Sequence, residues 1–234
     1  MKKKFALLLM FLAAAVSASE IKVVFFPCRE AVISARVESV LQEYPFKAGE
    51  LFKQESIICR LDNARYGLDL KKSTGHRDFA RVTYEDKKQL RAQNLTSDYE
   101  LRKAAYDLEM ATHAVEDAKL NFSFCAIKAP FSGKIVEIIT RPHEICRPGQ
   151  PLLRIIDDNE LLAVANVPLK NRSLTTAGNS VTLTVEGKGV VKGTIREVFP
   201  QADHRTGTVK IHILVPNTSK ALTPGMTGVL NHVQ

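Results

Sequence analysis

The sequence predicts an α+β protein of several modules: a small β-sandwich interrupted by an antiparallel α-helical hairpin, followed by an antiparallel β-barrel. Three observations predict it. Two strand-rich segments resemble each other at an offset of 94 residues. A stretch with helical periodicity separates them, and short β-branched runs follow the second segment. The chain of 234 residues has room for all of these modules.

The N-terminal segment has the layout of a secretory signal peptide. Lys2–Lys4 form a basic region, Phe5–Val16 form an apolar run of 12 residues, and small residues follow up to Ala18. That run is shorter than the roughly 20 residues that a membrane-spanning helix needs. We therefore expect residues 1–18 to be a cleaved signal peptide, with an uncleaved anchor as the alternative.

The two similar segments predict the β-sandwich. Ile33–Ala35 aligns with Ile127–Ala129, and Glu50-Leu51 aligns with Glu144-Ile145. Each copy holds short apolar runs that are broken by proline and glycine turns. Two or three short strands are only marginally stable alone. We therefore expect the two halves to pair into one folded unit, with the intervening chain forced outward.

The second half of the intervening chain has a clear helical pattern. Ser97 and Glu100 are spaced as a capping box, which predicts the start of a helix. Large apolar residues then recur every seven residues, with alanines three positions after each of the first three. These seam positions are Leu101, Leu108, Val115 and Phe122, and Ala104, Ala111 and Ala118.

The first half of the intervening chain has a weaker pattern. Phe79, Val82 and Leu90 form a partial apolar stripe, and Ser73–Gly75 is a point where a helix is expected to begin or bend. A turn at Ala92–Thr96 closes an antiparallel hairpin. One amphipathic helix lying on a globular body is the alternative to a projecting hairpin.

β-branched runs separated by Gly, Pro and Asn predict the barrel after Asp158. A further strand just before the first half, Ile21–Phe26, can join it. The predicted strands are Leu161–Val167, Val181–Val185, Val190–Val198, Thr208–Val215 and Gly228–Val233.

Composition and motifs give little support for chemistry. The chain has a formal charge of +8 but no basic run with interleaved aromatics, so we expect no nucleic-acid partner. Motifs for a nucleophilic serine, a zinc protease or a phosphate loop are absent. Asp203-His204 lies between strands and is interpreted as a turn, and the six histidines are scattered. We expect no catalytic residue, no cofactor and no metal site.

Four cysteines are widely spaced, without the CxxC spacing of zinc or thioredoxin-like sites. They are Cys28, Cys59, Cys125 and Cys146. Two interpretations remain. The cysteines form one or two disulfides in an oxidising compartment, or all four are buried thiols. The sequence does not choose among the three possible full pairings.

The arrangement resembles the periplasmic adaptor family (membrane fusion proteins, HlyD-like) of tripartite efflux pumps. The segments that carry the resemblance are Ala129–Gly133, Pro148–Leu152 and Ile156-Asp157 in the second half, Val37–Asp62 in the first half, and Gly193–Val198, Thr206–Thr208 and Val215–Met226 in the barrel. The resemblance as a whole extends over about residues 22–233.

The resemblance implies a domain organisation for the chain. Residues 31–62 and 125–157 would form a lipoyl-like (barrel-sandwich hybrid) domain, and 63–122 the α-helical hairpin, a coiled coil. Residues 19–30 and 158–234 would form the β-barrel domain.

The resemblance also implies a function. The protein would be a non-enzymatic periplasmic scaffold and conduit, held at the cell envelope through its partners. These are an inner-membrane transporter, an outer-membrane exit duct and further copies of the chain in a ring.

Family hairpin tips often carry Arg, Leu and Ser at seven-residue intervals, and Leu90 and Ser97 fit that interval. With Gln93 in the turn between them, they form the predicted partner-binding tip. The sequence departs from the pattern because Thr83 occupies the Arg position and Arg81 lies two residues away. Ser39 and Glu55 also replace glycines that are usual in the family's first half. The alternative is that Leu90 is a residue of the helix seam and Ser97 is a helix cap, and these roles require no binding partner.

A biotinyl or lipoyl carrier protein is the alternative function, because such carriers share the lipoyl-like fold. The candidate attachment residue is Lys47, in a Phe-Lys-Ala setting, whereas the second copy has Arg141 at the equivalent position. An intervening helical segment does not suit a swinging arm.

Overall fold

The computed structural model describes residues 20–171, 174 and 176–233. The predicted signal peptide, residues 1–18, lies outside the described residues. The chain divides into two compact units. The helical unit consists of Pro27–Leu161 and Asn217–Lys220. The described residues of the strand unit are 20–26, those of Leu162–Pro216 other than 172, 173 and 175, and 221–233.

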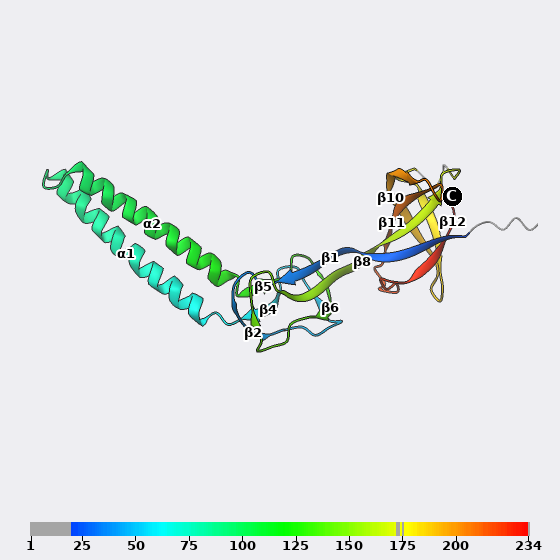
Figure 1. Ribbon diagram of the computed structural model, residues 1–234, viewed down its shortest axis with the longest axis horizontal. Coiled ribbons are helices and arrows are strands. Elements are labelled where there is room, and N and C mark those ends of the chain that lie inside the picture. The colour runs from blue at the N-terminus through cyan, green and yellow to red at the C-terminus, as the bar shows by residue number, and fades with distance from the viewer. Residues whose placement is uncertain (1–19, 172–173, 175, 234) are drawn as a thin grey trace, which may run out of the picture. The chain divides into compact units, whose positions relative to one another are not determined.

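The helical unit contains two long helices and a set of short strands (Figure 1). In chain order they are β2 (Ser39–Glu43), β3 (Leu51–Phe52), β4 (Ile57–Leu61), α1 (Ala64–Ala92), α2 (Asp98–Ser123), β5 (Ala126–Lys128), β6 (Gly133–Ile138) and β7 (Ile145–Cys146). Two long strands, β1 (Ile21–Ser34) and β8 (Pro151–Pro168), contribute residues to both units.

The short strands pair across the helical insertion, and they do so reciprocally. Ser39 of β2 lies opposite Cys146 of β7, and Phe52 of β3 lies opposite Gly133 of β6. These two pairs are related by the 94-residue offset of the sequence repeat, since Ser39 corresponds to Gly133 and Phe52 to Cys146. Each half therefore supplies the partner strand that the other half lacks.

One hydrophobic core joins the two halves. Tyr44 crosses between them as well, because its hydroxyl donates hydrogen bonds to the carbonyl oxygens of Thr140 and Leu152. The core residues from the first half are Ala35, Val37, Leu41, Phe52, Ile58, Cys59 and Leu61, and those from the second are Cys125, Ala129, Phe131, Ile135, Cys146, Leu152, Leu153 and Ile155. Residues 33–62 and 127–157 thus lie in one body, as the repeat predicted.

α1 and α2 lie side by side and run in opposite directions, joined by a short loop (Figure 1). α1 begins directly after β4, where the Asp62 carboxylate accepts a hydrogen bond from the Ala64 backbone N–H. It continues unbroken through Ser73–Gly75, so the predicted start or bend at that point was wrong. Among the described residues, the structure has no helix long and apolar enough to cross a membrane.

The strand unit is built from β9 (Ser180–Val185), β10 (Gly189–Asp203), β11 (Thr208–Pro216) and β12 (Thr227–Val233), with parts of β1 and β8. Their order in the sheet is β1-β12-β9-β10-β11-β8, and β1 also pairs with β8. Burial alternates along β11, where Val209, Ile211, Ile213 and Val215 point inward. This period of two is typical of a sheet with one face on a core.

Candidate interaction site on the helix pair

The α2 side of the contact between the helices follows the predicted seam. Ala104 and Ala118 are buried, and the remaining predicted seam residues are half-buried. Alanines at these positions let the partner helix approach closely, since they add little volume at the contact. The prediction of a seven-residue seam in α2 is confirmed.

The α1 side of the seam differs from the prediction. The half-buried positions of α1 include a series spaced alternately four and three residues apart, at Tyr66, Leu70, Ser73, Arg77, Ala80, Tyr84, Lys87 and Arg91. The predicted stripe was wrong, because Phe79 and Val82 are exposed and Leu90 lies at the edge of the seam. Long polar side chains can line a seam because their aliphatic stems pack against the alanines while their charged ends stay in water.

Two ion pairs hold the distal ends of the helices together. The Lys87 ammonium lies 3.4 Å from the Glu100 carboxylate, and the Arg91 guanidinium donates a hydrogen bond of 2.6 Å to Asp98. Exposed pairs of this kind contribute about 0–1 kcal/mol each. They set the alignment of α1 with α2 more than they stabilise it.

The predicted tip residues surround the loop between the helices. Leu90 is partly exposed, and its carbonyl oxygen accepts a hydrogen bond of 2.8 Å from the Leu95 N–H. Gln93 is the C-cap of α1 and is exposed. Ser97 is the N-cap of α2, and its hydroxyl accepts from the Glu100 N–H at 3.2 Å.

In this loop the Gln93 side chain is exposed to solvent, whereas the Ser97 hydroxyl caps the N-terminus of α2. Asn94 has a φ of 58°, which reverses the chain after Gln93. The second bond of the predicted capping box is replaced, since the Glu100 carboxylate contacts Lys87 instead. Arg81 and Thr83, where the sequence departs from the expected tip pattern, lie more than two turns before the end of α1. Arg81 is exposed, and the hydroxyl of Thr83 donates to the Phe79 carbonyl within α1.

A cluster of buried charges lies in the helical unit, around Asp157 and Asp158 of β8. Asp158 is 4% exposed, and its carboxylate accepts from Lys134 at 2.7 Å and from Lys220 at 2.5 Å. Burial raises the pKa of this carboxyl, but the hydrogen bonds from the two lysines outweigh it and hold the pKa below its usual value. The neighbouring Asp157 is paired in the same way with Arg29.

Sequence reasoning missed this cluster because its members come from distant parts of the chain. Lys220 is 62 residues from Asp158, and Arg29 is 128 residues from Asp157. Asn217 also donates to the Asp158 carbonyl oxygen, at 3.0 Å. The polar atoms named here all have partners, so the cluster stabilises the unit and offers no group to a ligand.

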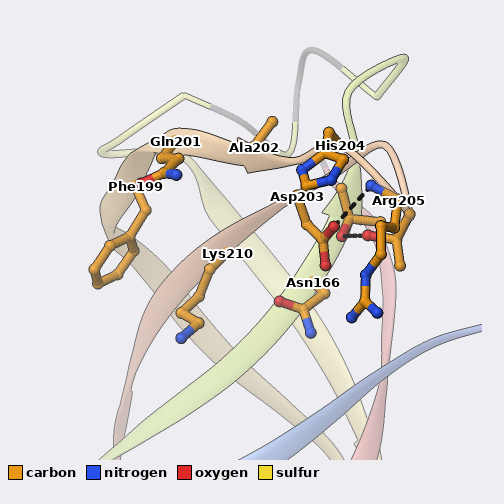
Figure 2. Close-up of a pocket in the computed structure, with 10 residues that line it drawn as sticks. Asn166, Phe199, Gln201, Ala202, Asp203, His204, Arg205 and Lys210 are labelled. Carbon is orange, nitrogen blue, oxygen red and sulfur yellow. Dashed lines mark hydrogen bonds between the residues drawn. The ribbon is translucent and has the colours of Figure 1, made fainter.

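The strand unit has an open hollow of about 740 Å³ beside the turn after β10 (Figure 2). The Asp203 carboxylate accepts from the Arg205 backbone N–H at 2.8 Å, and the Gly207 N–H donates to the Asp203 carbonyl. Asp203 and His204 are both exposed in this turn, as expected for a solvated loop. The carboxylate is used in shaping the turn rather than in orienting the imidazole.

Three of the four cysteines lie in the hydrophobic core, whereas Cys28 is only partly buried. All four cysteines are thiols, and Cys59, Cys125 and Cys146 are buried. Burial, with a smaller contribution from Cys146, raises the pKa of Cys59 to about 12. A thiol with so high a pKa is a poor nucleophile. Within the described part of the chain, no group of three His, Cys, Asp or Glu side chains could hold a metal ion.

Part of the chain matches a known family model. Residues 163–233 match the model described as the CusB-like β-barrel domain. The nodulation protein NolF of Rhizobium meliloti (strain 1021) is 25% identical over 227 residues, which cover 89% of this chain and 62% of NolF. The chain therefore spans less than two thirds of that relative's length.

Solved structures share the fold. A MacA–MexA chimeric protein that contains the α-hairpin domain of Pseudomonas aeruginosa MexA matches with a TM-score of 0.78 and 18% identity, covering 92% of this chain and 79% of the chimera. The membrane fusion protein Spr0693 of Streptococcus pneumoniae R6 matches with a TM-score of 0.73 and 13% identity, covering 92% of this chain and 99% of Spr0693.

Proposed function

We propose that this chain, which has the fold of the membrane fusion proteins, is a periplasmic adaptor subunit of a tripartite efflux or secretion system. The predicted resemblance to that family is confirmed by the matches to NolF and to the solved structures. In this role the protein acts as a scaffold and conduit between an inner-membrane transporter and an outer-membrane exit duct. It performs no chemistry of its own.

The observation that carries this proposal is the reciprocal pairing of the two halves. Because β2 pairs with β7 and β3 with β6, the chain between the halves leaves the core at Asp62 and returns at Cys125. The Leu61 N–H donates to the Cys125 carbonyl at 2.8 Å, so the two points are adjacent. An insertion with adjacent ends and 26 or more residues in each helix suits a spacer.

We divide the chain accordingly. Residues 31–62 and 125–157 form a lipoyl-like domain, 63–122 a helical hairpin, and 19–30 with 158–234 a β-barrel. The reciprocal strand pairs support the first assignment, and the contact between α1 and α2 supports the second. The strand order, the pairing of β1 with β8 and the family model support the third.

We place the exit-duct contact at the distal loop, at Leu90, Gln93 and Ser97. Gln93 is the best reporter, because it is exposed and because its side chain is not needed for either helix cap. A photo-crosslinking amino acid at Gln93 should capture an outer-membrane protein in living cells. The control position is Lys188, which is exposed in the turn between β9 and β10. Adducts from Lys188 alone, or none from Gln93, would contradict tip docking.

The carrier function makes a different prediction about Lys47. Lys47 is exposed, and its backbone N–H donates to the Glu50 carboxylate at 2.8 Å, which shapes the turn that displays it. The equivalent turn in the second half has the same hydrogen bond, from Arg141 to Glu144. A scaffold leaves Lys47 unmodified, whereas a carrier adds biotin or lipoate to it. The intact mass of the protein purified from its own cells separates the two functions.

A further inference from the structure

Two short connections join the helix pair to the two paired halves of the helical unit. On the outgoing side, β4 ends at Leu61 and α1 begins at Ala64. On the returning side, α2 ends at Ser123 and β5 begins at Ala126. Each connection therefore has two residues, and each residue has two soft backbone dihedrals. Connections of this kind act as a hinge unless the residues around them hold them in place.

Asp62, the first residue of the outgoing connection, is held through its backbone and its side chain. Its N–H donates to the Val40 carbonyl oxygen at 2.8 Å, and its carbonyl oxygen accepts from the Ser39 hydroxyl at 2.6 Å. Its carboxylate accepts from the Ala64 N–H at 3.0 Å, in the first turn of α1. Two adjacent residues of β2 therefore bind both backbone polar groups of Asp62, while its side chain binds the start of the helix.

The sequence repeat shows why a serine is needed at position 39. At the offset of 94 residues, Ser39 corresponds to Gly133 and Asp62 corresponds to Ile156. The second half has no space for a side chain here, because a Cβ on Gly133 would lie 2.1 Å from the Ile156 carbonyl oxygen. In the first half the equivalent carbonyl oxygen, that of Asp62, leaves room for a serine and accepts its hydroxyl. The hydroxyl therefore bridges a wider gap at the point where the chain leaves the strands for α1.

Tyr66 binds the first turn of α1 to the residue that precedes β2. Its hydroxyl donates to the Glu38 carbonyl oxygen at 2.9 Å, and its ring packs against the core that the two halves share. Glu38 is followed directly by Ser39 and Val40, which bind Asp62. Three consecutive residues therefore hold the outgoing connection and the beginning of the helix.

The returning connection is held by Phe124 and Cys125. The Phe124 ring packs against the same core, and the Arg36 guanidinium carbon lies 5.1 Å from the centre of that ring. This distance allows a cation–π attraction. Cys125 is 2% exposed, and its carbonyl oxygen accepts from the Leu61 N–H at 2.8 Å. The returning connection therefore has one residue buried in the core and one residue packed between the core and Arg36.

Residues 36–40 contact both connections, and we call this segment the collar. We propose that the collar fixes the direction of the helix pair relative to the paired halves, so that the joint is rigid and does not act as a hinge. The inference goes beyond the proposed function, since it concerns this chain alone and names no partner. In a scaffold, a rigid joint transmits a displacement of the distal loop to the paired halves instead of absorbing it.

A hinge at the same two connections is the alternative. The helix pair would then swing about Asp62 and Cys125, and the contacts of the collar would break and re-form. Ser39 and Tyr66 distinguish the two arrangements, because their hydroxyls bond across the joint. Ser39→Ala with Tyr66→Phe removes both hydroxyls and keeps the strand pairs and the packed carbon atoms, so the double variant changes the joint alone.

The distance between a spin label on α1 and a spin label on the paired halves reports the direction of the helix pair. Suitable exposed positions are Gln89, near the end of α1, and Lys53, in the turn between β3 and β4. Gln89→Cys and Lys53→Cys are labelled in the full chain with Cys28→Ser, since the other three cysteines are buried. An excess of unlabelled chain restricts the double electron–electron resonance signal to distances within one chain.

The proposal expects one narrow distance distribution in the labelled parent chain. In the double variant, the population outside the parent peak should rise about fivefold or more, because two hydrogen bonds no longer hold the joint. Circular dichroism checks that each variant folds, and Tyr66→Phe alone replaces the double variant if that one does not. A parent distribution as broad as that of the double variant, or a double variant as narrow as the parent, would overturn the proposal.

Two further variants separate the joint from general stability. Ser39→Thr keeps the hydroxyl and should keep the narrow distribution. Thr140→Val removes a buried hydroxyl whose hydrogen bonds, to Pro151 and from Gln150, lie within the second half. It should unfold at a lower urea concentration and leave the distance distribution narrow. Equal broadening in Thr140→Val and in the double variant would mean that lost stability, and not the collar, sets the width, which would also overturn the proposal.

Discussion

Glu55 and Gly149 occupy equivalent positions of the two halves, and both have a left-handed backbone, with φ of 64° and 85°. Each donates its backbone N–H to an alanine of the other half, Glu55 to Ala129 and Gly149 to Ala35. These alanines also correspond to each other in the repeat. The two halves therefore make equivalent hydrogen bonds to each other. Although Glu55 replaces the usual glycine, its backbone has the left-handed conformation that a glycine would adopt.

Replacing Glu55 by glycine should stabilise the protein. A non-glycine residue in the left-handed region costs about 1–2 kcal/mol, and the exposed contact of Glu55 with Lys128 offsets about 0–1 kcal/mol of that cost. We expect Glu55→Gly to raise the free energy of unfolding by about 0.5–1 kcal/mol, measured by urea unfolding followed by circular dichroism. Gly149→Ala should lower it by about 1 kcal/mol. Equal losses in both variants would contradict a strained Glu55.

Replacing Gly133 by alanine should destabilise the helical unit. A Cβ at this position would lie 2.1 Å from the Ile156 carbonyl oxygen in the neighbouring strand, far inside contact distance. Because the obstacle is backbone, we expect a loss of about 3 kcal/mol or more. Gly75→Ala is the matched control, since nothing lies within 4 Å of a Cβ there. That change should stabilise α1 by about 1 kcal/mol, and a similar loss in both variants would be inconsistent with the packing.

The buried charge cluster should make the protein sensitive to acid. The folded pKa of Asp158 lies below its usual 3.8, so its ion pairs contribute fully above that pH. Their contribution is lost as the pH falls from 3.8 through the folded pKa. We expect the free energy of unfolding to decrease over this window.

Asp158→Asn is the variant that tests the cluster. It should cost about 2 kcal/mol at neutral pH, because two lysines then lack their carboxylate. The same variant should lose less stability in acid than the wild type. Asp203→Asn, at an exposed carboxylate, serves as the control. An identical acid dependence in the wild type and Asp158→Asn would show that another group is responsible.

Cys59 should not react with thiol reagents in the folded protein. With a pKa of about 12, its thiolate fraction at pH 8 is about 10⁻⁴, and the side chain is fully buried. Ellman's reagent at pH 8 should modify Cys59 only after denaturant is added, as followed by peptide mass spectrometry. Rapid labelling of Cys59 in the native state would mean that the core opens locally.

The sequence predicted the α2 seam and failed on the α1 seam for one physical reason. A buried helix face can be recognised from the sequence only when apolar residues line it, as Leu101 and Leu108 do in α2. In α1 the seam contains Arg77 and Lys87, whose stems pack while their charges reach water, so no apolar period marks it. The exposed Phe79 and Val82 then gave a false signal.

The repeat was a stronger guide than its few identities suggested. It predicted that the halves pair, because neither half could bury its strands alone. It could not predict the Asp158 cluster, whose lysines come from β6 and from a loop 62 residues away. The location of the loop between the helices could be predicted because Ser97 marks the start of α2. A helix cap is a local signal that depends on few neighbouring residues.

The most direct test of the pairing between the halves is an engineered disulfide between Val40 and Ile145. These residues lie opposite each other in β2 and β7, both are exposed, and the bond from the Leu41 N–H to Glu144 makes them a closely spaced pair. Val40→Cys with Ile145→Cys should form an intramolecular disulfide in the folded protein under oxidising conditions, detected by peptide mass spectrometry, while each single variant does not. A double variant that folds yet keeps both new thiols reduced under oxidising conditions would contradict the pairing.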